Sequence, residues 1–304
     1  MQYCRARHAG ACYGVKRALR MVEEALSSSS QPVFTLGPLI HNPAVVEGLA
    51  RRGIKMVDSV DQIDTGTVVI RSHGVGPQVV KAARARGLEV LDATCPHVSK
   101  AQDAASDLSQ AGYCVIVVGE RGHPEVEGIS AYAGANAMVV QTPAELAESH
   151  IQTPVGVLAQ TTQTEEALAA IVSALNNQGY AAEVRDTICF ATRQRQEAAS
   201  ELAAQVDVML VVGGRNSSNT TRLAEICAAV CRRTHHLEDP AELSADWFSG
   251  DELVGITAGA STPEEQIVAV EMQLQAMFGA EVLEPGDGVD AAAAAASPKP
   301  EPAS

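Results

Sequence analysis

The sequence has no apolar run close to the roughly 18 residues that a membrane-spanning helix needs. Its first eight residues lack the basic-then-apolar pattern of a secretory signal. Its seven cysteines are odd in number and widely spread, which argues against a disulfide framework and favours a reducing compartment. We therefore expect a cytoplasmic protein that has no membrane partner.

Basic residues are also few, with 22 Lys and Arg against 37 Asp and Glu, for a net charge of −15. This balance argues against a nucleic-acid partner, and it requires any anion site to be built locally. The metal-binding pair C-x₂-C is missing, so cysteine spacing alone does not identify a metal. No strand-like segment precedes a G-x-G-x-x-G motif, so we expect no built-in nicotinamide site.

What the chain does contain is a strand–turn–helix unit that occurs three times. In each copy a cysteine lies in the turn, just before an amphipathic helical segment, where the partial positive charge of a helix N-terminus favours the thiolate. The copies are Cys95 between strand 88–92 and helix 100–110, Cys189 between strand 181–185 and helix 193–205, and Cys12 before helix 16–26.

Alternating strands and helices predict an α/β fold with parallel sheets, and the repeat predicts three similar small domains. We expect these domains to form a pseudo-threefold trefoil around a central cavity, because ligands collect beyond the carboxyl ends of parallel strands. The predicted domains are 1–95 (completed by a segment near 281–284), 96–188 and 189–284, followed by a disordered Ala- and Pro-rich tail, 285–304.

Three converging cysteines would suit a [4Fe–4S] cluster with one iron that has no protein ligand. Zinc held by three cysteines is a competing interpretation, and three buried structural cysteines are another. For the remaining cysteines the pattern favours core packing, because a free cysteine behaves as a small buried apolar residue. These are Cys4, Cys114, Cys227 and Cys231.

Two sets of polar turn residues recur in register across the repeat. One set is His41, His123 and the run Ser217, Ser218 and Asn219; the other is His73, Thr161 and Ser261. Such donors at helix N-termini suit a phosphate or diphosphate, although N-caps and turn residues have the same composition. Glu125, two residues after His123, could relay a proton or could merely favour the helix dipole.

Eight motifs, taken in order, resemble the 4-hydroxy-3-methylbut-2-enyl diphosphate reductase family (LytB type) from about Cys12 to Gln275. They are AGACYGV at 9–15, SHGV at 72–75, DATCP at 92–96, GHPEVEG at 122–128, QTT at 160–162, ICFAT at 188–192, NSSN at 216–219 and TAGAS at 257–261. The resemblance implies reductive dehydroxylation of the allylic diphosphate, the last step of the methylerythritol phosphate isoprenoid pathway, with two electrons and two protons.

The resemblance also implies the roles of individual residues. Cys12, Cys95 and Cys189 would bind one [4Fe–4S] cluster, and Glu125 would donate the proton with Thr161 in its relay. The diphosphate would be held by His41, His73, His123, Ser217, Ser218, Asn219 and Ser261. A ferredoxin or flavodoxin would supply the electrons to a monomer or homodimer. By charge alone, Lys16, Arg17, Arg20, Arg193 and Arg195 are candidates for docking that donor.

The stretch around the first cysteine departs from the family, which more often has an aromatic residue before Cys12 and Ala-Gly-Val after it. The presence of Tyr13 could change the shielding of the cluster. Two other function classes stay open from the residues: a non-redox lyase or condensing enzyme with an open-iron cluster, like quinolinate synthase, and a non-catalytic anion-binding or redox-sensing protein.

Overall fold

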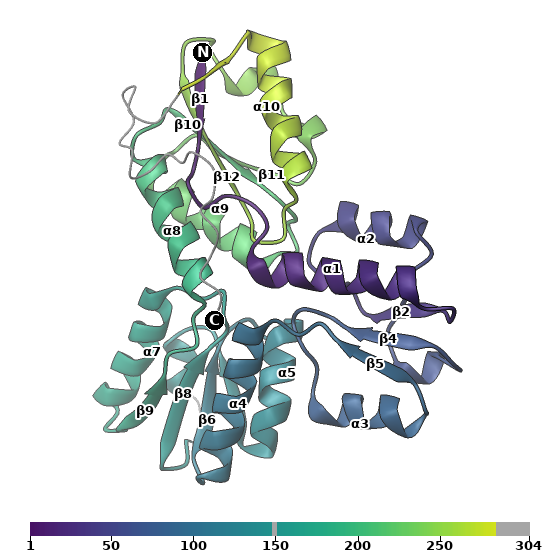
Figure 1. Ribbon diagram of the computed structural model, residues 1–304. Coiled ribbons are helices and arrows are strands. Elements are labelled where there is room, and N and C mark those ends of the chain that lie inside the picture. The colour runs from purple at the N-terminus through teal and green to yellow at the C-terminus, as the bar shows by residue number, and fades with distance from the viewer. Residues whose placement is uncertain (148–150, 284–304) are drawn as a thin grey trace. The chain divides into compact units, whose positions relative to one another are not determined.

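The computed structural model describes residues 1–147 and 151–283, which contain three parallel β-sheets in two compact units (Figure 1). The first unit comprises Met1–Tyr13, His41–Val45 and the chain from Phe190 onward; the second comprises Gly14–Ile40 and Val46–Cys189. Within the described residues no helix is both long enough and apolar enough to cross a bilayer.

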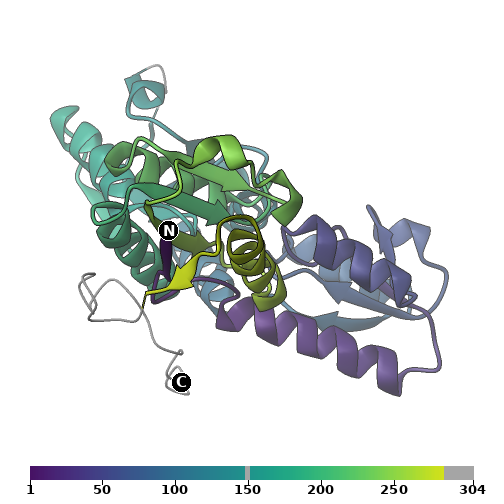
Figure 2. The same cartoon turned by 90° about the horizontal axis from the view of Figure 1, so that it is seen from above.

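The first unit is built on one five-stranded sheet. The strand order is β11 (Thr234–Leu237), β10 (Val208–Val212), β12 (Leu253–Ala258), β1 (Gln2–Arg5) and β13 (Glu281–Val282). All pairs are parallel, and Figure 2 shows β13 beside β1. Helices α8 (Phe190–Ala203), α9 (Ser218–Val230) and α10 (Glu264–Phe278) complete the unit, with short 3₁₀ turns at Pro240–Glu242 and Ala245–Trp247.

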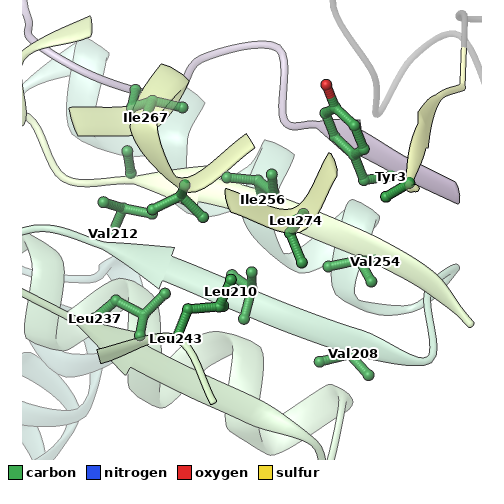
Figure 3. Packing of buried hydrophobic residues seen from close by; sticks show 13 residues of the cluster. Tyr3, Val208, Leu210, Val212, Leu237, Leu243, Val254, Ile256, Ile267 and Leu274 are labelled. Atoms are coloured by element: carbon green, nitrogen blue, oxygen red, sulfur yellow. The ribbon is translucent and has the colours of Figure 1, made fainter. Parts of the chain in front are cut away.

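Alternation along β10 assigns these helices to opposite faces of the sheet. Met209 and Val211 pack with residues of α8 and α9. Val208, Leu210 and Val212 pack on the other face, against α10 (Figure 3). Because both faces of the sheet are covered, its central strands are continuously apolar, as parallel strands usually are.

The second unit holds two four-stranded sheets. Their orders are β3 (Lys55–Val57), β2 (Val33–Leu36), β4 (Thr67–Ile70), β5 (Glu89–Asp92), and β7 (Ala137–Val140), β6 (Cys114–Val118), β8 (Val155–Ala159), β9 (Ala182–Arg185). The helices are α1 (Tyr13–Ser28), α2 (Pro43–Arg51), α3 (Pro77–Ala85), α4 (Pro96–Gln110), α5 (Pro124–Ala133), α6 (Ala144–Ala147) and α7 (Glu165–Asn177), with 3₁₀ turns at Val60–Gln62 and Gly134–Asn136. The first residues of α1 and α2 belong to the other unit.

The sheet around β6 is also covered on both faces. Ile116 and Val118 pack with α7, while Val115 and Val117 pack with α4 and α5. The same alternation as in β10 therefore recurs in a second copy of the repeat. This arrangement confirms the predicted α/β class with three parallel sheets.

The strand pairing differs from the expected domain assignment in one respect. β1 and β13 pair in the five-stranded sheet with β12, and not with β2–β5. The reason is that β1 is mostly buried, and parallel pairing with β12 covers it inside that sheet. The boundaries at residues 95 and 188 stay predictions, and the predicted tail 285–304 lies outside the described residues.

Each sheet has an edge strand that sequence patterning did not predict: β3, β7 and β11. Each of these strands supplies the carbonyl that accepts a hydrogen bond from the first turn residue after a central strand. The bonds are Gly37 N to Val57 O (2.8 Å), Gly119 N to Val140 O (3.0 Å) and Gly213 N to Leu237 O (2.8 Å). The edge strands thus anchor three equivalent turns, and these turns carry the polar residues considered next.

Candidate functional site

Three cysteines immediately precede helices. Helices α1, α4 and α8 begin one residue after Cys12, Cys95 and Cys189, three to four residues earlier than predicted. Cys95 is itself the N-cap of α4, with extended backbone angles. All three thiols therefore lie where a helix terminus favours an anionic sulfur.

The same backbone bond holds each of these cysteines. Their N–H groups donate to the carbonyl of the second residue after a strand, at Ala260 after β12 (3.0 Å), Ser72 after β4 (2.9 Å) and Thr161 after β8 (3.0 Å). The cysteine donors are Cys12, Cys95 and Cys189, respectively. The repeat found in the sequence is therefore a repeat of hydrogen bonding as well.

Burial separates these three cysteines from most of the others. Each is partly exposed, whereas Cys4, Cys227 and Cys231 are buried in the core of the first unit. Burial raises the pKa of Cys4 to about 11 and that of Cys227 to about 12, so both remain thiols. The prediction of core packing is confirmed for these three; Cys114 is partly buried against the core around β6.

The three partly exposed sulfurs are of the ligand type that iron–sulfur clusters use, and each lies next to a helix N-terminus. None of the seven cysteines, all within the described part of the chain, forms a disulfide. In neither unit do three His, Cys, Asp or Glu side chains of the described residues gather closely enough to hold a metal ion by themselves. Two large exposed side chains follow the first and third of these cysteines: Tyr13 is 52 % exposed and Phe190 is 66 % exposed.

In the second unit, Glu125 is buried in the first turn of α5 and is bound to Thr161. Its carboxylate accepts the Thr161 backbone N–H at 2.6 Å and the Thr161 hydroxyl at 3.0 Å. Its side chain is 3 % exposed. Burial raises the pKa of Glu125 to about 7, because the cost of desolvating the charge outweighs the two bonds from Thr161. The group therefore exchanges a proton near neutral pH.

His123 is the N-cap of the same helix. Its Nδ1 accepts the Glu125 backbone N–H at 3.1 Å, which leaves the proton of the neutral ring on Nε2. Burial, and secondarily the charge of Arg71, lower the pKa of His123 to about 4. His73 lies edge-on to this ring, with centroids 5.6 Å apart. At neutral pH His123 is thus a neutral hydrogen-bond donor, and the titrating group is Glu125.

In the first unit, the N-terminus of α9 carries hydroxyl and amide donors. Ser217 is the N-cap, and its hydroxyl accepts the Thr220 N–H at 3.4 Å. Ser217, Ser218 and Asn219 are all buried. Neither amide atom of Asn219 has a hydrogen-bond partner among the described residues. A buried, unpaired amide at a helix N-terminus is suited to a bound anion.

Ser261 joins this cluster from the turn after β12. Its hydroxyl donates to the His41 carbonyl at 2.9 Å and lies 3.4 Å from the Ser217 hydroxyl. Asn42 caps α2 by accepting the Val45 N–H at 3.1 Å. The first unit thereby brings Ser217, Ser261 and the His41 backbone together.

The register of the turns agrees with the first predicted set and refines the second. His41, His123 and Ser217 all lie five residues after the end of a strand. Thr161, however, lies two residues after β8, whereas His73 and Ser261 lie three residues after β4 and β12. Thr161 is therefore equivalent to Ser72 and Ala260. From this position its N–H donates to the Glu125 carboxylate.

Two residues have positions that sequence reasoning did not foresee. His236 was not among the predicted functional residues, yet its Nε2 donates to the Gly213 carbonyl at 2.9 Å and thus supports the turn before α9. The prediction that Arg195 docks a donor is wrong, because this side chain is buried and binds backbone carbonyls. Only the His–His–Leu alternation of β11 could have signalled the role of His236.

Comparisons with known proteins agree with this arrangement. A 4-hydroxy-3-methylbut-2-enyl diphosphate reductase from Pelobacter propionicus is 49 % identical over 264 residues, which is 87 % of this chain and 94 % of that protein. A solved (E)-4-hydroxy-3-methyl-but-2-enyl diphosphate reductase, described as the terminal enzyme of the non-mevalonate pathway, is 42 % identical with a TM-score of 0.68, covering 91 % of this chain and all of that one.

A second solved structure, the E-1-hydroxy-2-methyl-but-2-enyl-4-diphosphate reductase of Plasmodium falciparum, has a TM-score of 0.88 at 25 % identity and covers 93 % of this chain and 91 % of that one. Residues 4–275 match the sequence model of the LytB protein family. With the motifs, the three parallel sheets and these relatives in agreement, the chain belongs to the LytB protein family.

Proposed function

We propose that this chain reduces (E)-4-hydroxy-3-methylbut-2-enyl diphosphate to isopentenyl and dimethylallyl diphosphates, the last step of the methylerythritol phosphate isoprenoid pathway. Family membership and the names of the relatives support this reaction. The observation that carries it is the buried Glu125 carboxyl, bound to Thr161 with its pKa raised to about 7. Loss of a hydroxyl group as water requires an acid that is protonated at working pH, and Glu125 meets that requirement.

Glu125 acts in this proposal as the proton donor, and Thr161 orients it with two hydrogen bonds. After the proton leaves, the same two bonds stabilise the carboxylate. His123 stays neutral and offers its Nε2–H to the diphosphate. His73, 5.6 Å from His123 between ring centroids, would bind the same group.

Further diphosphate ligands are proposed at the N-terminus of α9 and in the turn after β12. Ser217, Ser218, Asn219 and Ser261 offer hydroxyl and amide groups, and the N-terminus of α9 offers backbone N–H groups. His41 is proposed as a ligand from its equivalent register. The unpaired Asn219 amide supports this role, because a bound phosphate oxygen would satisfy it.

We propose Cys12, Cys95 and Cys189 as the ligands of one [4Fe–4S] cluster, which when bound would pass on the two electrons of the reduction one at a time. Their partial exposure and helix-terminal positions support this assignment over Cys4, Cys227 and Cys231. The electrons would come from a ferredoxin or flavodoxin. Lys16, Arg17, Arg20 and Arg193 remain candidates for the docking surface.

The test uses protein purified without oxygen, with turnover of the substrate followed under a chemical reductant. We expect bound iron, activity that requires the reductant, and a loss of about 10²- to 10⁴-fold in Glu125→Gln. Glu127→Gln is the matched control, since Glu127 lies exposed in the same helical turn. A colourless zinc protein would refute the reductase, and turnover without a reductant would indicate a lyase.

The cofactor assignment has its own pair of variants. Cys95→Ser should abolish iron retention, whereas Cys227→Ser should retain iron because the Cys227 thiol is buried and donates to the Ala199 carbonyl. Iron content and the visible spectrum give the result. Equal iron loss in both variants would contradict the assignment.

A further inference from the structure

Arg195 is a buried cation that has no acidic partner among the described residues. It lies on α8, six residues after Cys189, and is 7 % exposed. Its guanidinium donates to the Gly10 carbonyl from Nε (3.3 Å) and Nη2 (2.9 Å), and to the Ala191 carbonyl from Nη1 (2.8 Å). It forms no ion pair with any carboxylate of the described residues. Buried arginines without an ion pair are uncommon, so this one calls for an explanation.

The Gly10 carbonyl, which accepts two of these bonds, belongs to the segment that leads to Cys12. Gly10 has φ +91°, and a Cβ added there would lie 3.0 Å from Ile267 Cδ1, so the position requires glycine. The N–H of Gly10 donates to Ala258 O (3.2 Å), and that of Cys12 to Ala260 O (3.0 Å). The carbonyls of Ala258 and Ala260, at and just after the end of β12, thus accept the N–H groups of the segment. Arg195 binds the same segment from the other side of the peptide chain, through the Gly10 carbonyl.

The other two copies of the repeat show that the scaffold itself does not need this arginine. The positions six residues after Cys12 and Cys95 are Ala18 and Ala101, and both are fully buried. A small apolar side chain therefore fills this place in two copies. Only the third copy places a guanidinium there, and it is directed at the turn of the first cysteine.

We propose that Arg195 is the positioning residue for Cys12. Its planar fork fixes the Gly10 carbonyl and thereby the path of the chain to the cysteine sulfur. Its charge, which no carboxylate of the described residues pairs with, lies at the Gly10 carbonyl, two residues before the cysteine, and would favour negative charge held there. Lysine cannot replace it fully, because a single ammonium group cannot donate two parallel bonds in a fixed plane. This inference rests on the proposed role of Cys12 as a cluster ligand.

The test compares Arg195→Gln and Arg195→Lys with wild type and with Arg233→Gln. Arg233 is a suitable control, because it pairs with Glu252 just before β11, at the opposite end of the same sheet. In iron-free protein, amide hydrogen exchange over residues 6–13 should accelerate roughly tenfold or more in Arg195→Gln and less in Arg195→Lys.

In iron-loaded protein, release of iron to a ferrous chelator should be about 10- to 100-fold faster in Arg195→Gln. Its midpoint potential should become more negative, because a positive charge is lost. Arg233→Gln should match wild type in all three measurements.

The outcomes separate the two proposals. If wild type binds no iron, the proposed function fails, while the exchange measurement still decides whether Arg195 orders the segment. If wild type binds iron and Arg195→Gln behaves like Arg233→Gln in exchange and iron release, the positioning role is refuted. Should Arg195→Gln fail to fold, Arg195→Lys takes its place, because it keeps the charge and lacks the planar guanidinium. Hydrogen exchange and iron release in Arg195→Lys that match wild type would then refute the role of the guanidinium.

Discussion

The turns that lead into α5 and α9 have the same architecture and different chemistry. Each follows a central buried strand, each begins with a glycine N–H bound to an edge-strand carbonyl, and each ends in a side chain that caps the helix. In α5 the cap is His123 and the next buried polar residue is Glu125. In α9 the cap is Ser217, and Ser218 and Asn219 follow.

This difference shows how one scaffold provides two functions. The N–H groups of a helix N-terminus favour an anion wherever they occur. Neutral donors, as in α9, leave that preference intact and make a site that does not titrate near neutral pH. A buried carboxyl, as in α5, uses the same position to hold a proton instead. The side chains therefore decide whether an equivalent turn binds an anion or supplies a proton.

The largest effect on the α9 side is expected in Asn219→Ala. The variant removes a buried amide that would pair with the diphosphate, so substrate or product should bind about 10- to 100-fold more weakly. The maximal rate at saturation should change much less. Asn216→Ala is the control, because Asn216 is exposed in the same turn. Equal binding by wild type and Asn219→Ala, measured by calorimetry, would refute the anion site.

The pH dependence of turnover should identify the α5 side as the source of the proton. Because the active form of Glu125 is protonated and its pKa is raised to about 7, the maximal rate should fall above that pH. The decrease should approach about tenfold for each further pH unit. Asn219→Ala should keep the same inflection. A rate that stays constant from pH 6 to 9 would show that Glu125 does not limit turnover.

A smaller effect is expected in Thr161→Val, which sharpens the assignment. The hydroxyl bond to the carboxylate is lost, while the bond from the backbone N–H remains. Since the hydroxyl bond lowers the pKa of Glu125, the variant should move the inflection of the rate profile to higher pH. An inflection that stays in place or moves downward would contradict the proposed relay.

The smallest expected effect is on stability. The pKa of Glu125 rises from an ordinary 4.5 to about 7 on folding, so the free energy of unfolding of wild type should decrease as pH rises through that range. Glu125→Gln does not titrate, and relative to wild type it should gain about 3 kcal/mol between pH 4 and pH 8. Urea unfolding at matched pH measures this difference. The lowered pKa of His123 changes stability with pH in the opposite direction, but His123 is present in both proteins, so its contribution cancels. Glu127→Gln should show no such gain.

Several features followed from the sequence alone. Apolar runs separated by turns predicted the central strands, since buried parallel strands need little besides continuous apolar residues. The predicted strands 88–92 and 181–185 agree with β5 (Glu89–Asp92) and β9 (Ala182–Arg185) to within one residue. The repeat identified the three cysteines and placed His41, His123 and Ser217 in one register. The edge strands β3, β7 and β11 were missed, because a half-exposed segment such as 234–237 has only a weak pattern.

Other features depend on contacts between residues distant in the sequence. Glu125 and Thr161 are 36 positions apart, and only their packing gives the carboxyl its two bonds and its raised pKa. Arg195 and Gly10 are 185 positions apart. The sequence therefore showed only that Arg195 carries a positive charge, whereas the fold buries its guanidinium and directs it at the Gly10 carbonyl. The sequence determined which groups were present and in what order. The tertiary structure decided which were desolvated and which were paired, because both depend on neighbours that only the fold brings together.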